Sequence, residues 1–181
     1  MKKRFFTAFL VSMLASFGGV SAQYSAVRVN ALALATGSLN AGIDVAVSRR
    51  WSVEGFLLWN PIKADAFRSQ VQAFSAGVRR WRFEPHTGFF VGIHSTTAFY
   101  DVGGKTAHRK GWMTGAGASC GYSWLLSNRW NITAEAGLGC FYMKEKKQEY
   151  NTSVWEDLRI YHFRRFVLAP SRAEISFSYL F

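Results

Sequence analysis

The sequence has 181 residues, a formal net charge of +11 and 49% hydrophobic residues. This length allows one domain. Beyond the N-terminal segment described next, no apolar run approaches the length of a membrane-spanning helix. A membrane location would therefore require a closed β-barrel, because only helices and closed barrels pair every backbone polar group in lipid.

The N-terminal segment has the three parts of a secretory signal peptide. Residues 2–4 are basic, residues 5–20 are mostly apolar, and Ser21 and Ala22 are small residues before Gln23. A membrane anchor is the alternative, but the apolar run is short and no basic stop-transfer sequence follows it. We predict a signal peptide over residues 1–22 and a mature domain over residues 23–181 with a net charge of about +8.

The mature sequence contains eight segments in which apolar and polar residues alternate as they do in strands. We expect strands over residues 26–35, 39–47, 51–59, 70–81, 88–100, 111–124, 130–142 and 166–181. Short turns follow the second, fourth and sixth strands, and longer charged segments, expected to be loops, cover residues 60–69, 101–110 and 143–165. This arrangement is typical of up-and-down barrels of the bacterial outer membrane.

The closing strand carries the most specific signal for that class. In residues 175–181, four bulky side chains would face one way, and Ser176 and Ser178 would face the other. A soluble sheet packed on a core can show the same alternation. An aromatic residue at the very end, Phe181, favours an outer-membrane barrel, because chain ends are usually frayed and polar.

Glycine recurs at alternate positions of segment 111–124, including Gly115, Gly117 and Gly121. Such a pattern weakens an ordinary strand. In an eight-stranded barrel, whose interior is just wide enough for side chains to fill, it would leave room for larger neighbours.

Charged residues occur on the strand positions opposite the apolar ones and are predicted to point into the barrel. Because unpaired buried charges are costly, we expect them to neutralise one another and to close the lumen. A gated ion path or a substrate site is the alternative. The predicted lumen network consists of Arg28, Asp44, Glu54, Arg79, His94, Glu135, Arg172 and Glu174.

No catalytic, metal or cofactor site is predicted. His94 and Thr96 share a face, whereas Ser95 lies on the other, so a serine nucleophile beside a histidine base is not expected. His86, His108 and His162 lack the spacing of metal ligands.

Cys120 and Cys140 are predicted to be free, outward-facing residues. A hairpin centred near Ser127 would place Cys120 opposite about Ala134, and Cys140 would then be roughly 20 Å away along the strand. A disulfide does not span that distance.

Basic residues gather in the segments expected to form the outer rim. The set is Lys105, Arg109, Lys110, Lys144, Lys146 and Lys147. Lysine and arginine bind phosphates, and lipopolysaccharide would be the local source of them; a merely solvated rim is the alternative. Nucleic-acid binding fits neither a secretion signal nor this distribution of aromatic residues.

Several short motifs recur in the same order in a known family. They are Arg49-Arg50-Trp51-Ser52, Asn60-Pro61, Gly111-Trp112, Gly115-Ala116-Gly117, Gly121-Tyr122, Arg129-Trp130-Asn131, Glu135 and residues 169–181. The sequence resembles a family of small outer-membrane β-barrel proteins from Bacteroidota that is catalogued as a domain of unknown function. Two departures stand out: Gly77 replaces an acidic residue that the family tends to carry, and the last loop lacks a cysteine pair.

The resemblance implies the fold and the compartment rather than an activity. It also implies that Tyr179 and Phe181 act as an assembly signal for the barrel-insertion machinery. We predict a monomeric, all-β, eight-stranded antiparallel transmembrane barrel in the outer membrane, with a structural or surface-interaction role, an unknown protein partner and no enzymatic activity. The alternatives are a narrow transport channel, a lipid-modifying barrel enzyme and a soluble secreted β-barrel that binds a ligand.

Overall fold

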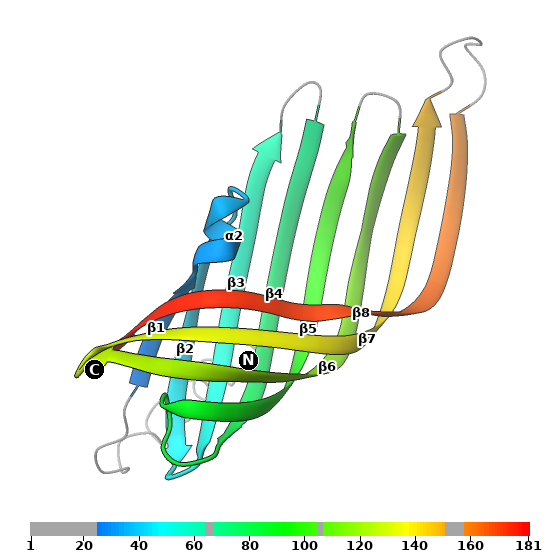
Figure 1. Ribbon diagram of the computed structural model, residues 1–181. Helices are drawn as coiled ribbons and strands as arrows, with labels where there is room; N and C mark the ends of the chain where they lie inside the picture. The colour runs from blue at the N-terminus through cyan, green and yellow to red at the C-terminus, as the bar shows by residue number, and fades with distance from the viewer. Residues whose placement is uncertain (1–24, 64–66, 105–106, 151–157) are drawn as a thin grey trace, which may run out of the picture.

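The computed structural model describes residues 25–63, 67–104, 107–150 and 158–181, so the predicted signal peptide lies outside the described residues. Eight antiparallel strands follow one another around a closed barrel, each paired with its neighbours in sequence (Figure 1). The strands are β1 (Ser25–Asn30), β2 (Leu39–Ser48), β3 (Trp51–Lys63), β4 (Phe67–Trp81), β5 (Gly88–Gly104), β6 (Ala107–Ser127), β7 (Trp130–Tyr150) and β8 (Leu158–Leu180). The predicted all-β, up-and-down topology is confirmed.

The barrel closes between its first and last strands. Ala26 lies opposite Leu180, and the pairing continues to Asn30 opposite Ser176. Beyond it, the backbone amide of Phe181 donates to the Ser25 carbonyl at 2.9 Å. The closing strand predicted from the sequence therefore pairs with β1 along its last residues.

The first predicted strand, residues 26–35, is partly wrong. β1 ends at Asn30, and a short helix, α2 (Ala31–Ala35), follows. The Asn30 side chain caps this helix by accepting from the amides of Leu32 and Ala33. Asn40 holds the same corner, because its side chain both accepts from the Asn30 amide and donates to the Asn30 carbonyl. An Ala-Leu run has high helix propensity, and this cap decides the outcome.

The three predicted loops are also wrong in extent, because the strands run through them. β3 continues to Lys63, where Pro61 lies opposite Gln70 of β4. β5 and β6 pair as far as Gly103 and His108, and β7 and β8 as far as Tyr150 and Leu158. Charge and proline mark solvent exposure here, whereas the backbone ladder continues. The strands β3 to β8 consequently project beyond α2 as long hairpins (Figure 1).

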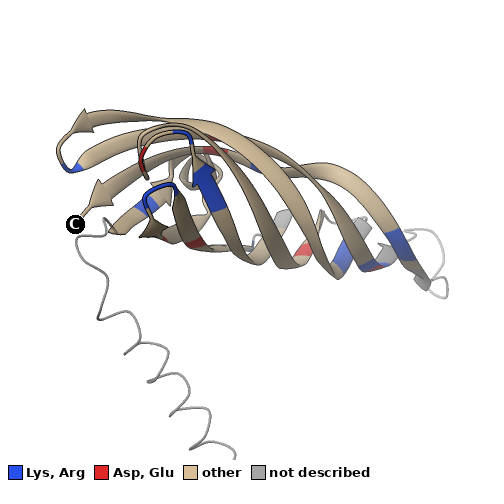
Figure 2. Ribbon diagram, turned by 90° about the horizontal axis from the view of Figure 1, so that it is seen from below, with Lys and Arg blue, Asp and Glu red and all other residues tan. Residues whose placement is uncertain are grey.

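Polar residues line the interior and apolar residues cover the outside. Ser176 and Asn131 are at most 1% exposed, whereas Ile93 and Leu168 are 68% and 77% exposed. Figure 2 shows long stretches of the strands that carry no Lys, Arg, Asp or Glu. No helix in the described part of the chain is long and apolar enough to cross a membrane.

Two belts of aromatic side chains bound the apolar outer surface. On β3, for example, Trp51 and Trp59 are 44% and 52% exposed, and on β5 Phe89 and Phe99 are 44% and 57% exposed. Ten residues separate the β5 pair, about 33 Å along the strand and roughly 25 Å after a typical barrel tilt. The lower belt contains Trp51, Phe89, Tyr122, Trp124 and Trp130, and the upper belt contains Trp59, Phe99, Trp112, Tyr142 and Phe166.

Candidate functional site

A network of charged side chains fills the middle of the barrel. Seven of the eight predicted residues form it directly: three guanidinium groups and four carboxylates contributed by β1, β2, β3, β4, β7 and β8. They are Arg28, Arg79, Arg172, Asp44, Glu54, Glu135 and Glu174. The alternation of side chains along each strand thus predicts the place of the site, because each of these residues occupies a position that points into the barrel.

Arg79 lies at the centre of the network and is 2% exposed. Its Nη1 lies 2.7 Å from Asp44 Oδ2, and its Nη2 lies 2.8 Å from Glu54 Oε2 and also contacts Glu135. The ring of Phe90 packs against the guanidinium, with the centroid 4.8 Å from Cζ. The planar fork of arginine suits several carboxylates at once, whereas a lysine ammonium would not replace it.

Glu54 and Glu135 each contact all three arginines. Arg28 Nη2 lies 2.6 Å from Glu54 Oε2, and Arg28 Nη1 lies 3.8 Å from Glu135 Oε2 and 3.0 Å from Glu174. Arg172 donates to Glu135 Oε1 at 2.7 Å and also to Glu54. These shared contacts connect distant strands through the interior, and the three guanidinium groups compensate three of the four buried carboxylate charges.

Glycines make the space that this network occupies. A Cβ on Gly42 would lie 2.8 Å from Arg28 Nε, and one on Gly77 would lie 2.9 Å from Glu54 Oε1 and 2.8 Å from His94 Cβ. The interior beside Gly77 is therefore filled by Glu54 and His94. The glycines of residues 111–124 have the predicted role as well, because a Cβ on Gly117 would lie 2.9 Å from His94 Nε2 and one on Gly121 would lie 2.6 Å from Phe90 Cζ.

His94, the eighth predicted residue, is 4% exposed and lies beside the network rather than in an ion pair. Neither ring nitrogen has a hydrogen-bond partner among the described residues. The Thr96 hydroxyl donates instead to Ser75 at 3.2 Å, and Ser95 lies on the outside, where it donates to the Gly115 carbonyl. Neither of these two hydroxyls therefore pairs with His94 as a nucleophile would with its base.

Aromatic side chains close the lower end of the interior. Trp81 and Phe90 are buried with ring centroids 4.5 Å apart, and Trp81 Nε1 donates to Ser52 at 2.9 Å. The β4–β5 turn supports them: Asn131 donates to the carbonyl of His86, whose φ is +66°. Strand parity would have predicted the inward position of Trp81, because it is two residues from Arg79.

A second polar cluster lies inside the upper end and was missed, because Glu145 belonged to a predicted loop. Glu145 is 7% exposed, accepts from the Tyr100 hydroxyl at 3.2 Å and faces Arg165 at 3.5 Å. Among the described residues, no group of three or more metal-ligating side chains could hold a metal ion.

The two cysteines are free and exposed on the outer surface, as predicted. The register places Cys120 opposite Ala136 and Cys140 opposite Ala116, so the expected pairing with Ala134 was wrong by two residues. The hairpin turns at Ser127 and Trp130 with a register shift at Leu125, which the sequence pattern did not reveal. Even in this register, the two cysteines lie too far apart along the strands to form a disulfide.

The predicted basic rim divides between the two faces of the sheet. Lys110, Lys144 and Lys146 occupy positions that alternate with the buried Glu145, so they face outward, whereas Arg109 is on the inward set. Lys105 and the side chain of Lys147 lie outside the described residues. At the opposite end, the Tyr179 hydroxyl accepts from Arg129 at 3.1 Å and its ring lies 5.0 Å from Trp130, whereas Phe181 is 64% exposed.

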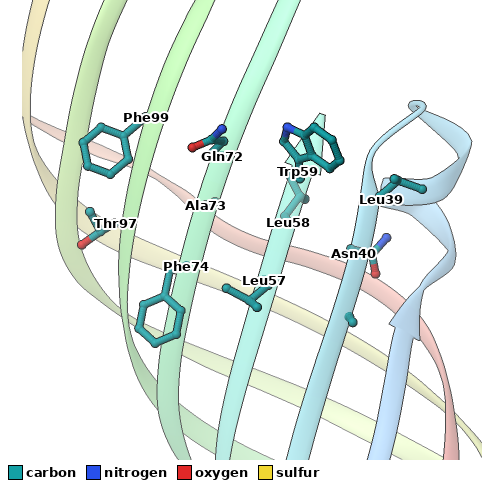
Figure 3. Close-up of a pocket in the computed structure, with 11 residues that line it drawn as sticks. Leu39, Asn40, Leu57, Leu58, Trp59, Gln72, Ala73, Phe74, Thr97 and Phe99 are labelled. Atoms are coloured by element: carbon teal, nitrogen blue, oxygen red, sulfur yellow. The ribbon is translucent and has the colours of Figure 1, made fainter. Parts of the chain in front are cut away.

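An apolar groove of 880 Å³ lies on the outer surface across β2 to β5. Figure 3 shows Trp59, Leu57, Phe74 and Phe99 around it, with no charged residue in its lining. Most of its walls are outward side chains of the strands, such as Leu39, Leu57 and Phe99. Such a groove suits an extended apolar chain more than a polar ligand.

The fold and interior together define an eight-stranded, all-β closed barrel with a charged, filled core. The chain belongs to the family described as "Protein of unknown function (DUF3575)", whose model matches residues 6–181. Comparisons with curated proteins and with solved structures found no match. The family description assigns no activity, so function has to be argued from the geometry.

Proposed function

We propose that this chain is an outer-membrane protein that crosses the bilayer as its closed barrel. The observation that carries the proposal is the reversed distribution of side chains, with charges inside and exposed apolar residues outside. A soluble protein rarely exposes so large an apolar surface, whereas lipid solvates it. The belts lie roughly 25 Å apart, close to the height of the apolar band of transmembrane barrels.

The proposed role is that of a structural or surface-interaction protein rather than a pore or an enzyme. The network of Arg28, Arg79 and Arg172 with their carboxylates occupies the middle of the lumen, and Trp81 and Phe90 occupy its lower end. An eight-stranded barrel has space for about one layer of side chains, so this filling obstructs passage. The basic, projecting hairpins remain available for partners at the cell surface.

The short turns and the closing residues would face the periplasm, and the projecting hairpins would face outward. Residues 1–22 would direct export, and Tyr179 and Phe181 would be read by the barrel-insertion machinery. Because the strands close on each other without a second chain, we propose a monomer.

Cell fractionation combined with gel mobility tests this proposal. The full chain should appear in the outer-membrane fraction and migrate differently before and after heating, because closed barrels resist detergent until heated. A soluble periplasmic chain without such a shift would contradict it. In planar bilayers the purified protein should give no steady current; a steady open current would contradict the obstructed lumen.

Deletion of Phe181 tests the assembly role. We expect a severalfold drop in outer-membrane levels, because the last residue pairs with Ser25 and its exposed ring completes the closing strand. Quantitative blotting of membrane fractions measures the drop, and Phe181→Tyr, which keeps an aromatic ring, is the matched control. Unchanged levels of the deletion variant would show that this residue is no assembly signal.

A further inference from the structure

Two pairs of like charges face each other across neighbouring strands beyond the upper belt. Lys110 of β6 lies opposite Lys146 of β7, and Lys144 of β7 lies opposite Arg164 of β8. Lys144 and Lys146 are two residues apart and share a face, so all four side chains lie on the same face of the sheet. Lys110, Lys146 and Arg164 are exposed, and Lys144 is half-buried. We call these four residues the cationic cluster.

The cluster is not neutralised by the described part of the protein. None of its four residues forms an ion pair there. Glu145, between the two lysines in sequence, points to the other face and interacts with Tyr100 and Arg165. Asp101 is the register partner of Lys110, which sets one carboxylate beside four cations. Directly opposed like charges destabilise a strand pair, so this arrangement favours an added anion.

The position of the cluster indicates which anion. Three of the four cations lie two residues, one step on the same face, beyond an aromatic residue of the upper belt: Lys110 beyond Trp112, Lys144 beyond Tyr142, and Arg164 beyond Phe166. Lys146 lies one further step beyond Lys144. The three rings form a continuous strip, with centroids 5.9 Å and 5.2 Å apart between neighbours. Aromatic belts of membrane barrels lie at the level of the lipid headgroups. The cations are therefore at the level of lipid phosphates.

Three arginines at the other end of the barrel differ in this respect. Arg80 packs over Trp51, with 5.8 Å to the ring centroid, Arg82 packs over Phe83, and Arg129 donates to Tyr179. Those arginines have partners from the chain itself. The cationic cluster therefore differs from the rest of the basic surface in having no such partners in the described part of the chain.

We propose that Lys110, Lys144, Lys146 and Arg164 form a binding site for the phosphates of an outer-leaflet lipid that carries two or more phosphate groups on its headgroup. Lysine ammonium groups and the arginine fork are both suited to phosphate oxygens. Neighbouring positions on adjacent strands are about 5 Å apart and diagonal ones about 7 Å apart, so the four groups cover an area that two phosphates can share. The inference rests on the proposed outer-membrane location.

Lipid binding to the purified full chain in detergent tests the site. The probe is a bisphosphorylated glycolipid, compared with the same lipid after removal of both phosphates. Replacing all four residues by glutamine should weaken binding of the phosphorylated lipid by roughly 100-fold to 1,000-fold, since each basic residue near a charged lipid surface contributes about a fivefold factor. The matched control, R49Q/R50Q/R80Q/R82Q, removes the same charge from the other end and should bind as the unchanged protein does.

Three results would overturn the proposal. Equal binding by the cluster variant would exclude these residues, equal binding of the dephosphorylated lipid would exclude the phosphates, and displacement by inorganic phosphate at the lipid's own concentration would indicate a site for free phosphate. The heat-dependent gel shift establishes that each variant is folded. If the unchanged protein is absent from the outer membrane, the proposed function fails; if it is present there but binds the lipid without the cluster, this inference alone fails.

Discussion

Cations are held in two different ways in this barrel. Inside, Arg79 contacts Asp44, Glu54 and Glu135. Arg28 and Arg172 contact the same two glutamates. Outside, beyond the upper belt, Lys110 faces Lys146 across the strands. The interior has to satisfy its charges within the chain because no solvent reaches them, whereas the outer cluster can take its counterion from the surroundings.

The two arrangements predict different effects when a charge is removed, on stability in the interior and on binding in the cationic cluster. Interior charges connect strands that are far apart in sequence, so they determine stability. Cluster charges oppose one another at small cost near solvent, so they determine binding. The predictions below follow this contrast from the largest expected effect to the smallest.

Arg79→Met should produce the largest loss of stability. The substitution leaves the carboxylates of Asp44, Glu54 and Glu135 without their shared cation, and breaking a buried pair typically costs about 3 to 5 kcal/mol. Urea unfolding in lipid vesicles, followed by gel mobility, measures the change. The matched control is Arg80→Met, because Arg80 is exposed and next in sequence; equal losses in the two variants would contradict the structural role of the network.

Gly77→Ala should have an intermediate effect. Its added Cβ would lie 2.7 Å from the Ile93 carbonyl and 2.9 Å from Glu54 Oε1, so backbone or carboxylate must move, at a cost of about 1 to 3 kcal/mol. The control is Gly55→Ala on the neighbouring strand, where the closest atom lies 3.7 Å away. The same unfolding assay compares them. A variant at Gly77 as stable as one at Gly55 would show that the interior has spare room.

Lys146→Glu should have the smallest effect and the opposite sign. In detergent free of phosphorylated lipid, an acid opposite Lys110 should stabilise the β6–β7 pair by about 0.2 to 1 kcal/mol. Unfolding in urea compares it with Lys146→Gln, which removes the repulsion without adding an attraction. A Glu variant less stable than the unchanged protein would mean that the lysines do not repel each other in the barrel.

The number and order of the strands, and which of their side chains point inward, could be predicted from the sequence because two-residue periodicity is a local signal. Arg28 and Glu174, although far apart in the chain, were both assigned to the interior by parity alone. The strand ends could not be predicted in the same way. Backbone pairing continues through Pro61 and Lys146, whose side chains indicate solvent rather than a break in the ladder.

Which side chains contact each other within the site could not be predicted from the sequence either. The sharing of Glu54 by three arginines depends on barrel register, which a shift of two residues, as at Cys120, is enough to alter. The helix after Asn30 depends on a cap formed by one side chain and a second asparagine ten residues later. Such contacts arise from three-dimensional closure rather than from local pattern.

The two native cysteines allow the most direct test of the central claim, that lipid surrounds the apolar outer surface. Cys120 and Cys140 are both exposed on that surface, between the aromatic belts. In membranes open on both sides, a charged, water-soluble maleimide should leave both thiols unlabelled until the protein is denatured. Asn128→Cys, in the exposed β6–β7 turn, should label at once as the control. Labelling of Cys120 and Cys140 in the native protein at the rate of that control would contradict the account.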